Sequence, residues 1–221
     1  LSQAVGVALA EAHIASKYPE GHKIMNHYTY CVLGDGDLEE GISQEAISLA
    51  GHLKLNKLIC LYDSNEVTLD GKLSDSFSDN TKLRFKSSNW NVLEVKDGND
   101  VNEINEAIAK AKKSKEPTLI IVNTVIGYGS KNQGTSKVHG AALGKEDGDY
   151  AKSVYKYKYP EFTVPKEIYK TLKDSFAKRG QTAYKKYQQV LNTYKVKHKK
   201  EYELFNDAIK LNVNKYIKDN V

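Results

Sequence analysis

Two short apolar runs, each followed by polar residues, constrain the fold of this chain more than any other feature. Residues 28–33 lead into the triplet Gly34-Asp35-Gly36, and residues 58–62 lead toward Asn65. Both runs are short and partly β-branched or aromatic, which predicts buried strands rather than helices. Asp35 and Asn65 therefore each follow the carboxyl end of a predicted strand.

The segment between these strands predicts a helix. Apolar residues recur at helical spacing from Ile42 to Ala50 and Gly51 follows, so we expect the helix to begin near Leu38 or Glu39. A strand-helix-strand crossover of this length places the two strands side by side and parallel in one sheet. Their carboxyl ends then meet at the sheet edge where open α/β sheets hold ligands.

The residues at this edge suit a divalent cation that holds a diphosphate. Mg2+ takes oxygen ligands and usually keeps one or two protein carboxylates, with phosphate and water in the other positions. Asp35 offers one carboxylate and Asn65 a neutral amide oxygen. Gly36 has no Cβ, so the backbone can approach the phosphates closely, and the N-terminus of the next helix offers N–H groups to an anion. The triplet alone fits an ordinary strand-to-helix turn equally well.

Several segments, in order and at compatible spacings, make a family resemblance specific. They are residues 34–46, residues 63–71, residues 79–85 with Trp90, residues 126–130 and residues 138–144. The GDG triplet with Asn65 resembles the thiamine-diphosphate motif, and the segments together resemble the transketolase family across most of residues 1–164. The resemblance implies thiamine diphosphate and Mg2+ (or Ca2+) as cofactors.

The same resemblance implies a role for each residue at the sheet edge. Asp35 and Asn65 would give side-chain oxygens to the metal ion, and Val67 would give its backbone carbonyl. Gly36 would contact the diphosphate of the cofactor, with Asn65 close to it.

Further residues are assigned by the resemblance alone. His139 would stand over the cofactor near the reacting sugar, where the alternative is a loop histidine with no partner. Glu40 and Glu45 resemble glutamates of the family's dimer interface, and they are equally compatible with solvated carboxylates at the start of a helix. Leu69 either packs on the cofactor ring or belongs to the core.

The implied activity is that of a transketolase in the pentose phosphate pathway. It moves a two-carbon ketol group from a ketose phosphate such as xylulose 5-phosphate to an aldose phosphate such as ribose 5-phosphate, with the cofactor carrying the difficult step. His139 would move the hydroxyl protons of the sugars. The sequence lacks the family's Gly-rich cofactor loop and pyrimidine-binding domain, so we expect a fragment that is inactive alone and a homodimer at full length.

Three alternatives stay open. Dihydroxyacetone synthase and deoxyxylulose-phosphate synthase use the same cofactor and the same sheet. A non-catalytic diphosphate-binding subunit could keep the metal site without the reaction. A naturally split enzyme could have this chain as its first subunit.

The whole chain is expected to be an α/β protein with a helical arm. Further strands are predicted at residues 90–95 and 118–125, and helices at residues 2–17 and 101–113, which gives a parallel sheet covered by helices on both faces. We place the thiamine-diphosphate-binding domain at residues 1–164. Residues 165–221 form the predicted arm. They begin with Pro165 at an expected helix start and carry apolar and aromatic residues at helical spacing, including a face over residues 202–211.

Composition argues against other function classes. The net charge of +5 comes from 33 basic and 28 acidic residues, and no nucleic-acid motif accompanies the Lys-rich clusters, so a solvated helix face explains them better than nucleic-acid binding. Cys31 and Cys60 both fall in predicted strands, which favours reduced, buried thiols over a disulfide or metal pair. The sequence shows neither an apolar stretch of about eighteen residues nor a lipidation motif. The cytoplasm is therefore the expected location.

Overall fold

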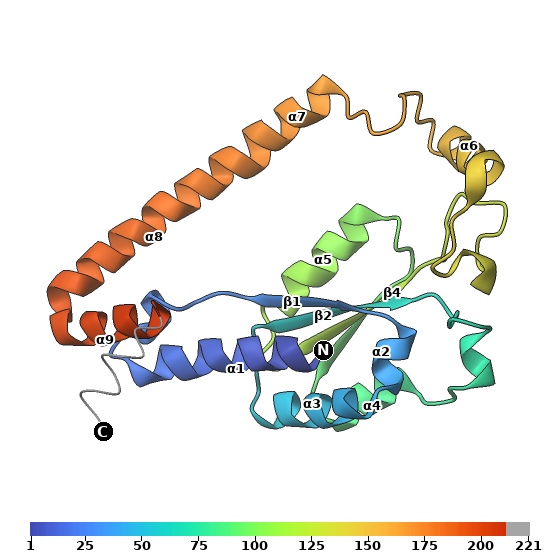
Figure 1. Ribbon diagram of the computed structural model, residues 1–221. Helices are drawn as coiled ribbons and strands as arrows, with labels where there is room; N and C mark the ends of the chain where they lie inside the picture. Colours follow the sequence, from blue (N-terminus) through green and yellow to red (C-terminus); the bar gives the residue numbers. More distant parts are fainter. Residues whose placement is uncertain (211–221) are drawn as a thin grey trace. The chain divides into compact units, whose positions relative to one another are not determined.

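The computed structural model describes residues 1–210 and divides into two compact units (Figure 1). The sheet unit consists of Leu1–Ala10 and His27–Lys158, and the helical unit of Glu11–Asn26 with the chain from Tyr159 onward. None of the helices between residues 1 and 210 has the length and apolar character needed to cross a membrane.

The sheet unit is built on four parallel strands in the order β1-β2-β4-β3. The strands are β1 (Thr29–Leu33), β2 (Leu58–Ser64), β3 (Asn91–Val95) and β4 (Thr118–Asn123). All four predicted strands are confirmed. β2 runs two residues beyond the predicted end because Ser64 pairs with Asn123 and its carbonyl accepts the N–H of Thr124 at 3.1 Å.

The helix after the GDG triplet differs from the prediction. A short helix α2 (Asp35–Glu39) begins directly at Asp35, and α3 (Gly41–His52) follows after an extended residue, Glu40, at φ −66° and ψ 130°. The Asp37 carboxylate accepts the N–H of Gly34 at 2.8 Å, which closes the first turn of α2. The predicted start at Leu38 or Glu39 is therefore wrong, because capping by Asp37 starts the helix earlier than the apolar spacing indicates.

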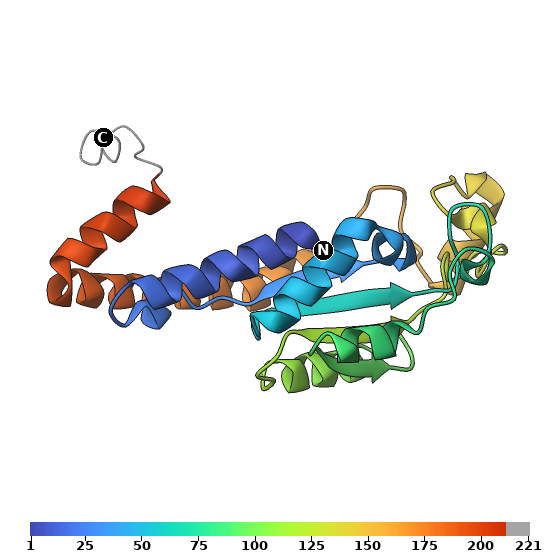
Figure 2. The ribbon, with the colours of Figure 1, turned by 90° about the horizontal axis from the view of Figure 1, so that it is seen from below.

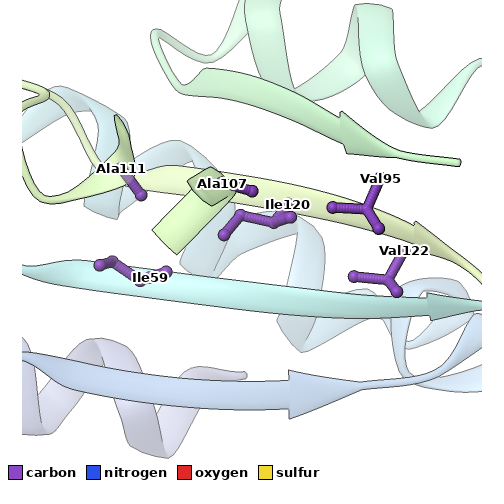
Figure 3. Packing of buried hydrophobic residues seen from close by; sticks show 6 residues of the cluster. All are labelled: Ile59, Val95, Ala107, Ala111, Ile120 and Val122. Atoms are coloured by element: carbon purple, nitrogen blue, oxygen red, sulfur yellow. The ribbon is translucent and has the colours of Figure 1, made fainter. Parts of the chain in front are cut away.

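Helices cover both faces of the sheet, as predicted (Figures 1 and 2). On one face α5 (Val101–Ala111) packs on the strands through a cluster of small and branched side chains. Figure 3 shows its six buried members: Ile59, Val95, Ala107, Ala111, Ile120 and Val122. The amphipathic spacing of α5 places its alanines against the sheet, and a small side chain lets helix and strands approach closely.

Aromatic residues join α3 and α4 (Thr81–Ser87) on the other face. Phe85 and Trp90 meet edge to face at a centroid distance of 5.0 Å, and both are buried. The indole N–H of Trp90 donates to the carbonyl of Ile47 in α3 at 2.9 Å. This bond satisfies the polar end of a buried ring and fixes α3 against the end of α4. The first part of α1 (Ser2–Lys17), with buried Val5 and Ala8, and α6 (Gly144–Val154) complete the helices of this unit.

The predicted helical arm is confirmed in the helical unit. It contains α7 (Lys166–Leu172), a π-helical turn η4 (Lys173–Ala177), α8 (Lys178–Lys197) and α9 (Lys199–Ile209). Of the apolar face predicted over residues 202–211, Leu211 lies outside the described residues. The division between functional domains at residue 164 stays a prediction.

The helical unit also contains residues 11–26, which the sequence had grouped with the sheet. Tyr18 and Ile24 from this segment form a buried cluster with Tyr194 and Phe205, and Tyr18 meets Phe205 edge to face at 5.9 Å. The Tyr187 hydroxyl donates to the Ile24 carbonyl at 3.0 Å. These contacts join residues about 160–190 positions apart, so helical periodicity could not reveal them.

We predict that Gly51→Ala destabilises the sheet unit. A Cβ at this position of α3 would overlap the backbone carbonyl of Ser88 and lie 3.2 Å from Trp90 Cδ1. Relieving that overlap moves backbone, and we expect a loss of about 1–3 kcal/mol, which corresponds to a Tm lower by roughly 3–10 °C. Thermal unfolding measures it. Gly6→Ala in α1 is the matched control, because a Cβ there meets no atom within 4 Å and should leave the Tm unchanged or raise it.

Candidate functional site

Asp35 lies at the carboxyl end of β1, on the first residue of α2, and its side chain is buried with 4% exposed. The Tyr62 hydroxyl, from β2, donates to Oδ1 of Asp35, while Oδ2 is buried without a hydrogen-bond partner. Burial raises the pKa of Asp35 above its usual range, and the hydrogen bonds from Tyr62 and from the Asn65 backbone oppose that rise. Asp35 is therefore a buried carboxyl group with one oxygen that lacks a hydrogen-bond partner.

Asn65 follows β2 and starts a tight loop at the same sheet edge. Its Oδ1 accepts the backbone N–H of Val67 at 3.1 Å, and Glu66 between them has a left-handed backbone with φ 62°. The N–H of Leu73 then donates to the Glu66 carbonyl at 3.0 Å, which holds the loop closed. A non-glycine residue in this region costs about 1–2 kcal/mol. The surrounding hydrogen bonds keep it there and fix the orientation of the Asn65 side chain.

The register of the first two strands brings Asp35 and Asn65 together. Leu33 pairs with Tyr62, so the chain leaves both strands at nearly the same level of the sheet. Asp63 connects this edge to the next strand, because its Oδ1 accepts from the Thr124 hydroxyl and its Oδ2 lies 3.5 Å from Nδ2 of Asn65. The expected convergence of the strand ends is thus present in the geometry.

Sequence reasoning missed Tyr62 and Thr124 as partners of these carboxylates. The signal for Tyr62 was available, since it lies on an inward-facing position of β2 and a buried tyrosine needs a partner for its hydroxyl. The pKa of Tyr62 is raised mainly by burial and next by the hydrogen bond to Asp35, so its hydroxyl stays protonated and can donate. Tyr62 and Ser64 also line a cavity of about 390 Å³ together with Glu66 and residues 77–81.

Gly36 lies exposed in the first turn of α2, and a Cβ built on it would meet no atom within 4 Å. The space beside its Cα is therefore open. Val67 is buried by its side chain, with 7% exposed. Its backbone is part of the Asn65 loop, where it pairs with Lys72.

Three further predicted site residues are all exposed. Leu69 is 67% exposed, so the alternative of core packing is wrong. Glu40 and Glu45 are both exposed, one between α2 and α3 and one on α3. No hydrogen bond within the described part of the chain links the carboxylate of Glu40 or Glu45 to Asp35 or Asn65.

His139 lies in the long loop between β4 and α6, directly after a short 3-10 turn η3 (Ser136–Val138). It is half-buried, and its Nδ1 is buried without a hydrogen-bond partner. A Cβ on Gly127 would lie 2.6 Å from Cγ2 of Val138, so this glycine, with φ 62°, allows the residue before His139 to pack closely. The close packing of Val138 on Gly127 thus holds the backbone next to His139 in place.

A buried hydrogen bond anchors the same loop to α6. The Ser130 hydroxyl donates to Oδ2 of Asp147 at 2.6 Å, and the N–H of Lys131 donates to Oδ1 at 2.8 Å. These two donors lower the pKa of Asp147, which therefore stays ionised at neutral pH. An ionised carboxylate bonded at both oxygens fixes the base of the loop that carries His139.

The donor set at the sheet edge fits a hard cation. Within residues 1–210 no three His, Cys, Asp or Glu side chains gather into a metal cluster. Such a cluster is not needed for Mg2+ that shares a phosphate ligand, because one carboxylate, one amide oxygen and one backbone carbonyl leave positions for phosphate and water. The unpartnered Oδ2 of Asp35 is an oxygen that a cation would satisfy.

The chain matches one protein family along almost its whole length. A family model described as "Transketolase, thiamine diphosphate binding domain" matches residues 1–213. Transketolase of Bacillus subtilis (strain 168) is 48% identical over 215 residues, which are 96% of this chain and 32% of that protein. Transketolase of Staphylococcus aureus (strain MRSA252) is 46% identical over 222 residues, 99% of this chain and 33% of that protein.

Solved structures agree with the sequence comparison. Transketolase from Leishmania mexicana superposes with a TM-score of 0.88 at 38% identity, over 93% of this chain and 31% of that one. A Pichia stipitis transketolase in complex with sedoheptulose-7-phosphate superposes with a TM-score of 0.89 at 37% identity, over 93% and 31%.

The chain spans about a third of the length of these relatives. The family match supports thiamine diphosphate as the cofactor of the domain, in agreement with the polar sheet edge at Asp35 and Asn65. On this evidence the chain belongs to the transketolase family and corresponds to its thiamine-diphosphate-binding domain.

Proposed function

We propose that the protein containing this chain is a transketolase that moves a two-carbon ketol group between sugar phosphates. The observation that carries the proposal is the buried, unpartnered Oδ2 of Asp35 at the sheet edge of a domain of this family. The relatives are about three times as long as this chain, so activity is proposed for the intact protein and not for residues 1–221 alone.

In this proposal Asp35, Asn65 and the Val67 carbonyl hold Mg2+ or Ca2+, and Gly36 lies against the diphosphate. Asp35 supports the role because its buried carboxyl has a free oxygen, and Asn65 because its loop is closed by hydrogen bonds. Leu69 supports contact with the cofactor ring only through its exposure. Thiamine diphosphate, when bound, supplies the electron sink for carbon-carbon cleavage and formation.

His139 is the proposed proton-transfer residue. Its buried Nδ1 without a partner, and a loop fixed by Gly127, Ser130 and Asp147, support a positioned imidazole. An imidazole can accept a proton from one sugar hydroxyl and return it to another near neutral pH. His139 would thus hold and move protons of the donor and acceptor sugars.

Sugar phosphates are the proposed substrates, with xylulose 5-phosphate as donor and ribose 5-phosphate as acceptor. Solved Pichia stipitis transketolases in complex with sedoheptulose-7-phosphate and fructose-6-phosphate support this class. We also propose a homodimer, with Glu40 and Glu45 at the interface, and their exposure is compatible with that role. A cytoplasmic location stays a prediction from the sequence.

The first prediction of this proposal concerns His139. We expect the intact protein with thiamine diphosphate and Mg2+ to transfer ketol groups from xylulose 5-phosphate to ribose 5-phosphate, and His139→Ala to lower kcat by about 100- to 10,000-fold. His22→Ala is the control, because His22 is exposed in the helical unit. Wild-type protein that binds the cofactor but shows no turnover would favour a relative with other substrates or a non-catalytic subunit.

A second prediction concerns the metal ligand. Asp35→Asn keeps the shape and removes the charge, so we expect Mg2+-dependent retention of thiamine diphosphate to weaken by at least about 100-fold. Calorimetric titration of the intact protein measures it. Asp70→Asn is the control, because Asp70 is exposed in the loop after β2, and it should change the affinity for thiamine diphosphate little. Equal affinity in Asp35→Asn and wild type would contradict the metal assignment.

A third prediction concerns pH. Because burial raises the pKa of Asp35, a proton competes with Mg2+ for the carboxylate, and Mg2+ affinity should rise with pH until Asp35 is ionised. Tyr62→Phe removes the donor to Oδ1, which raises that pKa further and moves the midpoint of Mg2+ binding to higher pH. Mg2+ titrations from pH 4 to pH 9 measure the midpoint.

Tyr28→Phe is the matched control for the pH experiment. It removes a tyrosine hydroxyl that donates to the Lys112 carbonyl at 3.2 Å, elsewhere in the sheet unit. Its midpoint should coincide with that of the wild type. A midpoint that moves to lower pH in Tyr62→Phe would show that the hydroxyl does not stabilise the ionised form of Asp35.

A further inference from the structure

The side-chain amide of Asn65 can present either its oxygen or its nitrogen to a ligand, and two neighbours decide which. Oδ1 accepts the backbone N–H of Val67 at 3.1 Å, and Nδ2 makes a long hydrogen bond of 3.5 Å to Oδ2 of Asp63. A half-turn of the amide would set Nδ2 against that N–H and Oδ1 against the carboxylate, and both contacts would be repulsive. The orientation of the amide is therefore fixed from both ends.

The sheet places Asp63 next to Asn65. Asp63 lies in β2, and Asn65 directly follows Ser64, the last residue of that strand. Side chains two residues apart along an extended strand point to the same face of the sheet. The carboxylate of Asp63 therefore lies beside the amide of Asn65, and both side chains are half-buried.

Thr124 fixes the rotation of the Asp63 carboxylate. Asn123, the last residue of β4, pairs with Ser64, and the N–H of Thr124 donates to the Ser64 carbonyl at 3.1 Å. This pairing places the Thr124 hydroxyl next to Oδ1 of Asp63, to which it donates. With Oδ1 engaged by Thr124, Oδ2 is the oxygen that faces Asn65. A carboxylate has only acceptors, so it selects the nitrogen end of the amide as its neighbour.

We propose that Asp63 and Thr124 are positioning residues that keep the oxygen of the Asn65 amide, rather than its nitrogen, available to the metal ion. The inference rests on the metal site of the proposed function, in which Asn65 is a ligand and neither Asp63 nor Thr124 is. An amide oxygen has two lone pairs, so Oδ1 can accept the Val67 N–H and still bind a cation. A turned amide would present N–H groups, which a hard cation does not bind.

The charge of Asp63 would also attract a cation, and three substitutions separate that effect from orientation. Asp63→Asn removes the charge but keeps an acceptor oxygen for Asn65, and its own amide can donate to the Thr124 hydroxyl. Asp63→Ala removes both the charge and the acceptor. Thr124→Val removes the donor that holds Asp63 and leaves every charge in place.

Calorimetric titration of the intact protein with Mg2+, in the presence of thiamine diphosphate, tests the proposal. We expect Asp63→Ala to weaken Mg2+ binding by about 10- to 100-fold, and Thr124→Val by about 3-fold or more, because both release the amide of a metal ligand. Asp63→Asn should bind Mg2+ at least about 5-fold more tightly than Asp63→Ala, because it keeps the orientation. Equal losses in these two variants would show that Asp63 acts by charge alone and would overturn the proposal.

Thr118→Val is the matched control for Thr124→Val. Thr118 is buried at the start of β4, and its hydroxyl accepts from the Asn91 amide at 3.1 Å. The substitution removes one threonine hydrogen bond roughly 20 Å away along the same strand, so it should lower the Tm without changing the affinity for Mg2+. Thermal unfolding of each variant separates a loss of stability from a loss of binding, and Thr124→Val keeps the test valid if Asp63→Ala does not fold.

Asp35→Asn, measured in the same way, distinguishes failure of this inference from failure of the proposed function. If Asp35→Asn weakens Mg2+ binding while Thr124→Val binds Mg2+ as tightly as the wild type, the positioning role is wrong and the metal site stands. If Asp35→Asn itself binds Mg2+ as tightly as the wild type, the metal assignment and the positioning role are both wrong.

Discussion

The in-register pairing of β1 with β2 is the constraint on which the candidate site depends. It places Leu33, the last residue of β1, beside Tyr62, so that Asp35 at the start of α2 lies within hydrogen-bond reach of the Tyr62 hydroxyl. A slip of one residue would turn Tyr62 to the opposite face and remove the donor. The same register holds Asn65 at the same edge and sets Cys31 against Cys60, two free thiols. One parallel ladder thus determines the polar edge.

β4 extends this edge toward the loop that carries His139. Its last residues pair with the end of β2, and the Thr124 hydroxyl donates to Asp63. From there the chain enters the loop that Ser130 and Asp147 fix to α6. In the proposed function, the metal and diphosphate would be held at the strand ends and His139 on the anchored loop, so separate contacts would position the two groups.

The sequence predicted what depends on local pattern. Apolar runs located the four strands, and the crossover rule located Asp35 and Asn65 at one edge, because both follow from spacing and handedness. It failed where a single side chain or a distant contact decides: capping by Asp37 starts α2 early, and Tyr18 and Ile24 join residues beyond position 186. The exposure of Leu69 and the pairing of Tyr62 with Asp35 needed the tertiary structure.

Buried polar atoms without partners supply an independent argument about the site. In the described part of the sheet unit three such side-chain atoms occur, Oδ2 of Asp35, Nδ1 of His139 and Oγ1 of Thr29. Each buried atom left unsatisfied costs about 1–3 kcal/mol. Two of the three belong to residues that the family resemblance assigns to metal and substrate, and nothing in the structure explains Thr29. A bound cation would supply the missing partner of Asp35, and a sugar hydroxyl that of His139. Binding of these groups would therefore remove the cost at both residues.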